Sequence, residues 1–294
     1  MSSSENFSGV VTAWLIAERA VESAVLFGSG ARTDGEVAVA DRWSDLDLHI
    51  VTTAGARLEH VDWPRAVPGR SFCFQVVRPA TGGVRKVTAM FAAGQIDLVL
   101  VPAAQMRLAR LALRCGLQRR WRSVAVALNE MATCLATGYR FLKGEKKWGG
   151  FYARVAEEMP GVRLSDEEVR NLADVFLCDL LWVLQKIDRG ELAAAQHALH
   201  RSLAETNFRL LRERRQRRGL PLPSFGLARR VETMLPPDEL AWVRVDARSE
   251  CADLRRAAWA ALAGLKALMG QLAPEWRVQP GVDELLAHHG GRPG

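Results

Sequence analysis

The two stretches that decide the fold are Leu26-Phe27-Gly28-Ser29 and Asp45-Leu46-Asp47-Leu48-His49-Ile50, which are separated by fifteen residues. The first stretch ends an apolar run, and its small residues Gly28 and Ser29 predict a turn after a buried strand. The second stretch alternates polar and apolar side chains, which predicts a strand with one polar face. Since alternate residues of a strand point to one side, Asp45 and Asp47 share that polar face.

The paired carboxylates indicate a metal site. Two carboxylates held this close repel each other unless a cation lies between them, and Mg²⁺ takes oxygen ligands of this kind. Asp97 lies in a second apolar segment, residues 95–101, with flanking residues like those of Asp47. If the two strands are neighbours, Asp97 completes a cluster of three. The alternative for Asp45 and Asp47 is a solvated strand face, although aspartate is disfavoured in strands.

The turn at Gly28-Ser29 predicts a phosphate contact. A small turn lets backbone N–H groups approach phosphate oxygens, and the hydroxyl of Ser29 can donate a further hydrogen bond. Arg32 follows within reach of a triphosphate. Turn and carboxylates together predict a site for a nucleotide with its metal, suited to in-line phosphoryl displacement. The alternative is a turn without a ligand.

Phe27-Gly28-Ser29, Asp45-Leu46-Asp47 and Asp97 resemble the nucleotidyltransferase superfamily of DNA polymerase beta. The run from Asp41 to Asp47 resembles more particularly the adenylyltransferases that act on streptomycin, and Trp182, Lys186 and residues 189–192 resemble a stretch of their helical domain. Two features depart from the family pattern: a longer spacing from Ser29 to Asp45, and Gly30-Ala31 before Arg32.

The resemblance implies ATP as substrate, with Mg²⁺ on the catalytic and metal-binding residues Asp45, Asp47 and Asp97. It implies nucleotide contacts from Gly28, Ser29, Arg32 and Lys186. Transfer of AMP to a hydroxyl also needs a general base. Asp97 is one candidate, and the alternatives are Glu130, Glu157 and Glu158.

The rest of the chain predicts an α/β core followed by an all-α domain. Strand patterns at residues 71–77 and 85–92 form a hairpin around a turn at residues 79–83. After Pro102 helical patterns dominate. We therefore expect a mixed-sheet nucleotidyltransferase domain at residues 1–102, a helical acceptor-binding domain at 103–279 and a frayed tail at 280–294. The expected helices are 103–118, 121–142, 166–188, 190–218 and 249–271, the third with a capping box at Ser165.

Composition and charge limit the remaining function classes. The chain has 294 residues, 49% hydrophobic and 25% charged, which excludes disorder and a fibrous protein. Five scattered cysteines without a C-x-x-C pair predict neither a disulfide framework nor a zinc site, and they fit a cytoplasmic protein. We expect no membrane span. The net charge is +7, and residues 103–294 hold the excess.

We expect AMP transfer to a small hydroxylated molecule, by resemblance an aminoglycoside-type antibiotic, with a lincosamide or another antibiotic as an alternative. A second hypothesis is nucleotidyl transfer to tRNA or protein, because the rear of the chain is basic. A binding module with an inactive site is disfavoured. The arginine-rich run 209–218 is interpreted as a solvated helix end rather than a nucleic-acid contact. His49 is interpreted as a polar strand residue, and His197 and His200 as surface residues.

Overall fold

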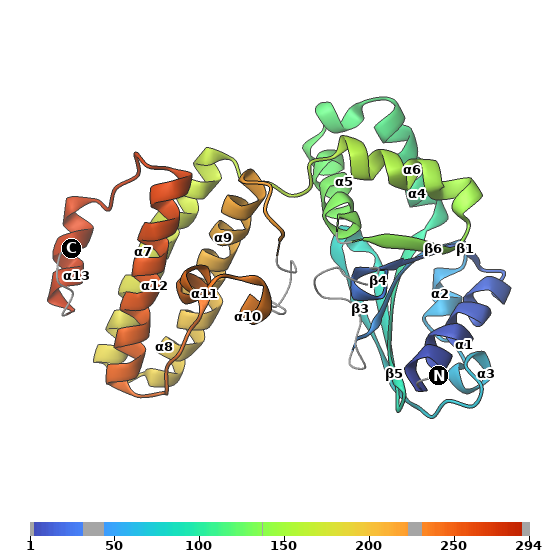
Figure 1. Ribbon diagram of the computed structural model, residues 1–294, viewed down its shortest axis with the longest axis horizontal. Helices are drawn as coiled ribbons and strands as arrows, with labels where there is room; N and C mark the ends of the chain where they lie inside the picture. Colours follow the sequence, from blue (N-terminus) through green and yellow to red (C-terminus); the bar gives the residue numbers. More distant parts are fainter. Residues whose placement is uncertain (1–2, 32–43, 137, 223–230, 290–294) are drawn as a thin grey trace. The chain divides into compact units, whose positions relative to one another are not determined.

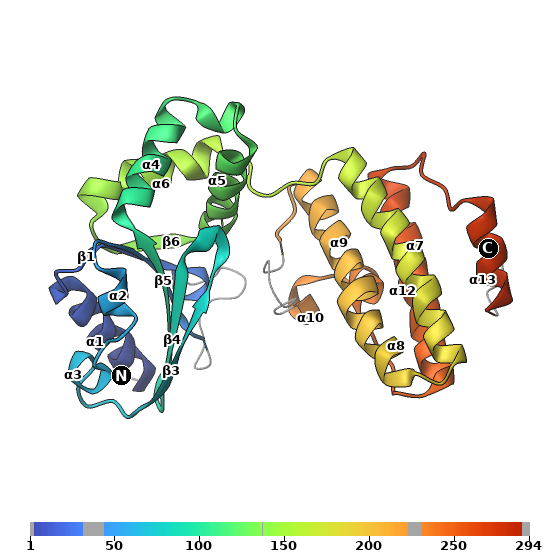
Figure 2. The ribbon, with the colours of Figure 1, turned by 180° about the vertical axis from the view of Figure 1, so that it is seen from behind.

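The computed structural model describes residues 3–31, 44–136, 138–222 and 231–289, and it divides into two compact units, Met1–Val162 and Arg163–Gly294. Each unit is described by itself (Figures 1 and 2). Arg32 and the residues up to position 43 lie outside the described part.

The first unit is built on a six-stranded mixed sheet of order β3-β4-β5-β2-β1-β6. β2 and β5 are parallel, whereas the other pairs of neighbours in this order are antiparallel. The strands are β1 (Val21–Phe27), β2 (Leu46–Thr52), β3 (Phe72–Pro79), β4 (Arg85–Phe91), β5 (Gly94–Pro102) and β6 (Tyr139–Lys143).

Helices lie on both faces of this sheet (Figure 1). On one face, Leu48 and Ile50 of β2 pack with Leu15 of α1 (Ser3–Ala17) and with Trp63 of α3 (Trp63–Ala66). A short helix, α2 (Gly55–Leu58), adds Leu58 to this core. On the other face, Val25 and Val51 pack with residues of three further helices. These helices are α4 (Ala103–Arg114), α5 (Arg122–Leu135) and α6 (Glu145–Glu158). Because side chains alternate along β2, Asp47 points to this second face.

The second unit is all-helical around one core. Its helices are α7 (Asp166–Asp188), α8 (Leu192–Ala198), α9 (Glu205–Arg217), α10 (Val231–Met234), α11 (Pro237–Val243), α12 (Cys251–Leu272) and α13 (Pro280–His288). The predicted capping box is confirmed, since Ser165 Oγ accepts from the Glu168 amide and the Glu168 carboxylate accepts from the Ser165 amide. The predicted fold class, an α/β core with a mixed sheet followed by an all-α domain, is confirmed.

The predicted boundaries need correction. The first unit extends past Pro102 to Val162, because α4, α5 and α6 bury their apolar faces on the sheet. The helix predicted over residues 121–142 ends at Leu135, and β6 follows after Gly138, which has a φ of 95° that favours glycine. The expected tail at 280–294 contains the helix α13, while residues 290–294 lie outside the described part.

Two of the predicted helices are interrupted. The segment at 103–118 is helical only to Arg114, and a short 3₁₀ turn at Leu117–Arg119 follows. The segment at 190–218 consists of α8 and α9, joined through a π-helical stretch at Leu199–Ala204. Among the described residues no helix combines the length and the apolar character that a membrane span requires.

The arginine-rich run differs from its predicted role. Arg214 and Arg215 of α9 are buried, and both pair with the buried carboxylate of Glu239 from α11. Arg214 Nη1 lies 2.6 Å from Glu239 Oε1, and its guanidinium stacks 5.3 Å from the centre of the Trp242 ring. Only Arg209, Arg217 and Arg218 of this run are exposed. The centre of the run is therefore an interior ion network rather than a solvated helix end.

Candidate functional site

Three carboxylates meet on the polar face of the sheet. Asp47 of β2 and Asp97 of β5 are direct partners in the parallel register, and Asp45 precedes β2. The ligand atoms of all three lie within 4.8 Å of one another. Asp97 is buried at 3% exposure, and the other two are half-buried. The expectation that the two strands are neighbours is confirmed, whereas the metal-binding role of the cluster stays a prediction.

The turn after β1 lies against this cluster. Gly28 has a φ of 63°, which favours glycine, and a Cβ atom added there would lie 3.4 Å from Asp47 Oδ2. Ser29 Oγ is buried and has no hydrogen-bond partner among the described residues. A buried hydroxyl without a partner is costly, so this atom is suited to meet a ligand. The phosphate role predicted for Gly28 and Ser29 stays a prediction, and Arg32 lies outside the described residues.

Asp97 has polar partners on β4 that the sequence did not reveal. Lys86 Nζ lies 2.6 Å from Asp97 Oδ2, and Thr88 Oγ1 donates to Asp97 Oδ1 at 2.5 Å. Arg78 of β3 donates in turn to Thr88 Oγ1 at 3.2 Å. The predicted hairpin pairs β3 with β4, whereas Thr88 lies opposite Asp97 through the pairing of β4 with β5, which no sequence pattern indicated. These contacts fix the orientation of the Asp97 carboxylate.

His49 lies on the same strand face, further into the core. Its Nδ1 atom and the Tyr152 hydroxyl of α6 share a hydrogen bond, and the Phe27 ring lies 5.7 Å away between centroids. Burial lowers the pKa of His49 to about 4, so the imidazole is neutral near pH 7. Burial also raises the pKa of Tyr152 well above its usual range. His49 therefore adds no positive charge near the carboxylates.

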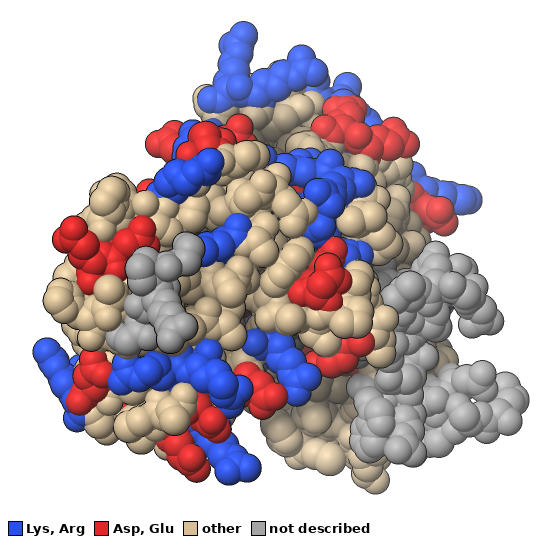
Figure 3. Space-filling view, turned by 60° about the vertical axis from the view of Figure 1, so that its left-hand side comes forward, with Lys and Arg blue, Asp and Glu red and all other residues tan. Residues whose placement is uncertain are grey.

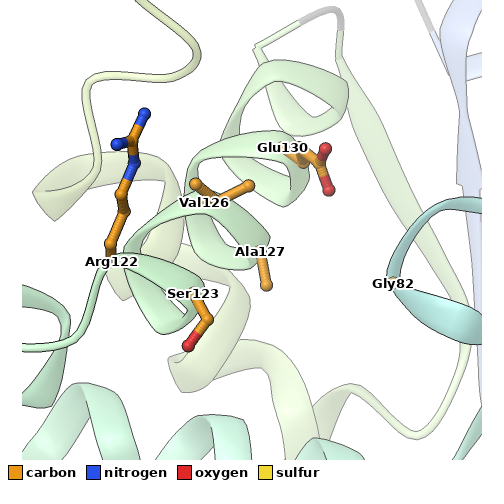
Figure 4. A pocket seen from close by; sticks show the side chains of 6 residues that line it. All are labelled: Gly82, Arg122, Ser123, Val126, Ala127 and Glu130. Carbon is orange, nitrogen blue, oxygen red and sulfur yellow. The ribbon is translucent and has the colours of Figure 1, made fainter.

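Helix α5 places the thiol of Cys134 within electrostatic reach of Asp47 in the cluster. Burial of part of the side chain raises the pKa of Cys134, and the charges of Asp47 and Glu130 raise it further, although the residue keeps some exposed surface. A cavity of about 510 Å³ runs along α5 (Figure 4). Its lining consists of Gly82, Arg122, Ser123, Val126, Ala127 and Glu130.

The other proposed bases lie elsewhere. Glu157 and Glu158 are exposed at the end of α6, and Glu158 pairs with Arg154 at 2.7 Å. The negative charge of Glu157 contributes to a raised pKa of Tyr139, after the larger effect of burial. Among the three glutamates, Glu130 is the one whose charge acts on Cys134 together with the charge of Asp47.

Lys186 lies on α7 in the second unit. Its Nζ atom is 2.5 Å from Glu191 Oε2 and 5.0 Å from the centre of the Trp182 ring. Arg189 also approaches Glu191, at 4.0 Å. Lys186 therefore contacts both Trp182 and Glu191, and its nucleotide contact stays a prediction. His197 and His200 are exposed, as expected.

Most of the excess positive charge belongs to the first unit. Residues 1–162 hold 20 basic and 15 acidic side chains and residues 163–294 hold 20 and 18, which together make the 40 and 33 of the chain. Within the first unit, residues 103–162 hold 11 basic and 4 acidic side chains. Basic and acidic side chains are interspersed over the face seen in Figure 3. The basic excess therefore lies on the helical layer that covers the carboxylate face.

We expect Lys86→Gln to destabilise the metal-free protein by about 1–3 kcal/mol, because the buried Asp97 carboxylate loses its charged partner. A divalent cation can then take over the role of the ammonium group, so the affinity for Mg²⁺ should rise about tenfold. Thermal unfolding with and without Mg²⁺ measures both effects. Arg85→Gln, which removes a more exposed partner of Glu59, is the control. An unchanged response to Mg²⁺ would contradict the assignment.

Comparison with solved structures returns matches of low sequence identity. The crystal structure of an aminoglycoside 6-adenyltransferase from Bacillus subtilis matches with 10% identity and a TM-score of 0.41, over 99% of this chain and 98% of that chain. The crystal structure of a nucleotidyltransferase-like protein from Exiguobacterium sibiricum 255-15 matches with 12% identity and a TM-score of 0.31, over 90% of this chain and 74% of that chain. No protein-family model and no curated protein matches the sequence. Because both TM-scores are low, the fold assignment rests on the sheet order and the helices themselves.

Proposed function

We propose that the protein is a Mg²⁺-dependent nucleotidyltransferase that moves AMP from ATP to a hydroxyl group of a small molecule. One observation carries the proposal: three carboxylates converge on the sheet beside a turn whose buried Ser29 hydroxyl has no hydrogen-bond partner among the described residues. A metal site next to a phosphate-binding turn is the arrangement that phosphoryl transfer needs. A solvated strand face would not bury Asp97 in the same cluster.

The residues present fit a hard divalent cation. Asp45, Asp47 and Asp97 supply the oxygen ligands that Mg²⁺ prefers. When bound, the ion would offset the negative charge of the carboxylates and of the α-phosphate oxygens. Gly28 and Ser29 would hold phosphate oxygens through backbone N–H groups and the hydroxyl. Arg32 and Lys186 are proposed as further nucleotide contacts.

The reaction is an in-line displacement at the α-phosphorus of ATP. The acceptor oxygen forms the new bond to phosphorus, the bond to the bridging oxygen of the β-phosphate breaks, and pyrophosphate leaves. The hydroxyl proton passes to a carboxylate. Asp97 is the first candidate for this base when it does not hold the metal, because it lies beside Asp47 in the cluster. Glu130 of α5 is the second, because its charge and that of Asp47 both act on Cys134.

The proposed acceptor is an aminoglycoside-type antibiotic, which rests on the resemblance of the sequence motif. A lincosamide or another antibiotic is the alternative among small molecules. Transfer to tRNA or protein is favoured by a different observation, the excess of basic side chains in residues 103–162. The cytoplasm, where ATP is present, is the proposed location.

The test is pyrophosphate release by the full chain with Mg²⁺ and ATP across aminoglycosides and lincosamides, with tRNA in a parallel assay. We expect release that depends on both the acceptor and Mg²⁺, with EDTA as the control. Expression in a sensitive bacterium should raise the concentration of the active antibiotic needed to stop growth. If neither a small molecule nor tRNA stimulates release, the proposed function is wrong.

A further inference from the structure

Two of the three carboxylates, Asp47 and Asp97, belong to a row of side chains that crosses four strands. Val76 of β3 lies opposite Thr88 of β4, Thr88 lies opposite Asp97 of β5, and Asp97 lies opposite Asp47 of β2. Directly opposite residues point to the same side of a sheet, so this row lies on one face. The hydrogen bond from Thr88 to Asp97 confirms that these two side chains share the face.

The neighbouring row is apolar at its outer end. Phe74 of β3 lies opposite Met90 of β4, and Met90 lies opposite Gln95 of β5. Since Phe74 and Val76 are two positions apart, they point to the same face as Thr88 and Asp97. The intervening residue Gln75 turns the other way, because its amide accepts from Trp63 in the opposite layer.

Phe74 and Val76 are exposed where an edge strand would ordinarily carry polar side chains. Their exposed fractions are 53% and 46%. Val77, the next residue of β3, points to the opposite face and packs against the core formed with α1 and α3. β3 is the outermost strand on its side of the sheet. Exposed apolar side chains on an edge strand carry an aggregation cost, which makes a function at these positions expected.

The charged side chains that β3 and β4 themselves carry are all positive. Arg78 and Lys86 form the row on the other side of Val76, and neither β3 nor β4 contains an aspartate or a glutamate. Lys86 also compensates Asp97. A polycation bound over β3 and β4 would meet Arg78 and Lys86 there and would reach acidic side chains only at the carboxylate cluster, which disfavours it.

We infer that Phe74 and Val76 of β3, with Met90 of β4, form the subsite for the non-reacting part of the acceptor. The inference rests on the proposed AMP transfer to a small molecule, and among the acceptors proposed above it favours the alternative, a lincosamide or another antibiotic, over the aminoglycoside-type antibiotic. Val76 is two strand spacings, or about 10 Å, from Asp97. The acceptor is therefore a small hydroxylated molecule with an alkyl or aryl face about 10 Å from its reacting hydroxyl, and it carries at most one positive charge.

The subsite also places the acceptor on the correct side of the metal site. The Gly28–Ser29 turn follows β1, on one side of β2, and the apolar surface lies beyond β5 on the other side. Phosphate and acceptor would then approach the carboxylates from opposite sides, as an in-line displacement requires. Phe74 and Val76 act as specificity-determining residues, because they touch the acceptor without touching the reacting atoms.

The experiment is calorimetric binding to the full chain with Mg²⁺ and α,β-methylene-ATP, which is not cleaved at the reacting bond. Three probes are compared: chloramphenicol, a neutral aryl diol; lincomycin, a singly charged alkyl-bearing lincosamide; and streptomycin, a polycation. We expect chloramphenicol or lincomycin to bind more tightly than streptomycin. The double variant Phe74→Ser, Val76→Thr should weaken that binding about tenfold, because part of the buried apolar surface is lost.

The control is Ile16→Ser on α1, which removes an apolar side chain of similar exposure, 55%, from the other side of the sheet. It should leave binding of every probe unchanged. Tightest binding by streptomycin, equal affinities of parent and double variant, or binding of none of the three probes would each overturn the inference. Binding of tRNA that depends on Phe74, without binding of a small molecule, would also overturn it.

The same titrations separate this inference from the proposed function. Binding of α,β-methylene-ATP is measured first, before any acceptor is added. If binding of the analogue is as tight without Mg²⁺, or in a variant that lacks the Asp47 carboxylate, as it is in the parent with Mg²⁺, the proposed function fails. If the analogue binds as expected and the double variant binds acceptor like the parent, only the acceptor subsite fails.

Discussion

Asp47→Asn is expected to lower the rate of pyrophosphate release on the order of 10³-fold while leaving the protein folded. The substitution keeps the shape of the side chain but removes one of the charges proposed to hold Mg²⁺. It also removes one of three negative charges that repel one another, because carboxylate oxygens of Asp45, Asp47 and Asp97 lie within 4.8 Å of one another. The metal-free variant should therefore unfold at a higher temperature than the parent, so that activity falls while stability rises.

Two measurements check this result: pyrophosphate release with an active acceptor, and thermal unfolding with and without Mg²⁺. Asp62→Asn is the matched control, because Asp62 is an exposed residue of the same unit and its side chain caps no helix amide. It should change neither quantity. A rate in Asp47→Asn equal to that of the parent would refute the metal assignment. A loss of stability in the metal-free variant would show that Asp47 has a structural role instead.

The second large effect is expected at Glu239. Glu239→Gln removes the negative charge shared by Arg214 and Arg215, whose side chains are only 9% and 6% exposed. Removing one member of a buried ion network leaves uncompensated charge in the interior, which costs about 3–5 kcal/mol. We expect the free energy of unfolding of the second unit to fall by this amount, measured by urea denaturation.

The chain has two compact units, so it can unfold in two steps. The step changed by Glu239→Gln should be the one that Mg²⁺ alone does not shift, because the proposed metal ligands all lie in the first unit. Glu275→Gln is the control in the same unit, because its pair with Arg170 is exposed on both sides and should contribute at most about 1 kcal/mol. A loss at Glu239 no larger than the loss at Glu275 would refute the network as a source of stability.

Sequence patterns predicted that the three carboxylates of the candidate site lie together, because the residues that flank each aspartate indicate its strand and the face to which it points. Asp45 and Asp47 alternate with leucines, so their common face follows from the period of a strand. Asp97 repeats the same flanks, which made the pairing of β2 with β5 predictable. Lys86 and Thr88 gave no such signal, because their importance depends on the register of β4 against β5.

The predictions that needed correction concern longer-range contacts. A run of six arginines indicates a solvated surface by composition, yet two of them pair with Glu239, which follows more than twenty residues later. The placement of α4, α5 and α6 depended on β6, a five-residue strand that pairs with β1 from more than a hundred residues away. The periodicity of apolar residues shows which face of a helix is buried, but it does not show against which other helix or strand that face packs. The predicted domain boundary after Pro102 was wrong for this reason.

The edge position of β3 has a consequence for how such a protein can diversify. Phe74 and Val76 contribute to no buried core, and two strands separate β3 from β2, on which Asp47 lies. Substitutions at these two positions can therefore alter the shape and polarity offered to an acceptor at little cost in stability. Related proteins with this sheet could therefore come to use new acceptors through substitutions at these two positions of β3, without any change in the carboxylates of β2 and β5.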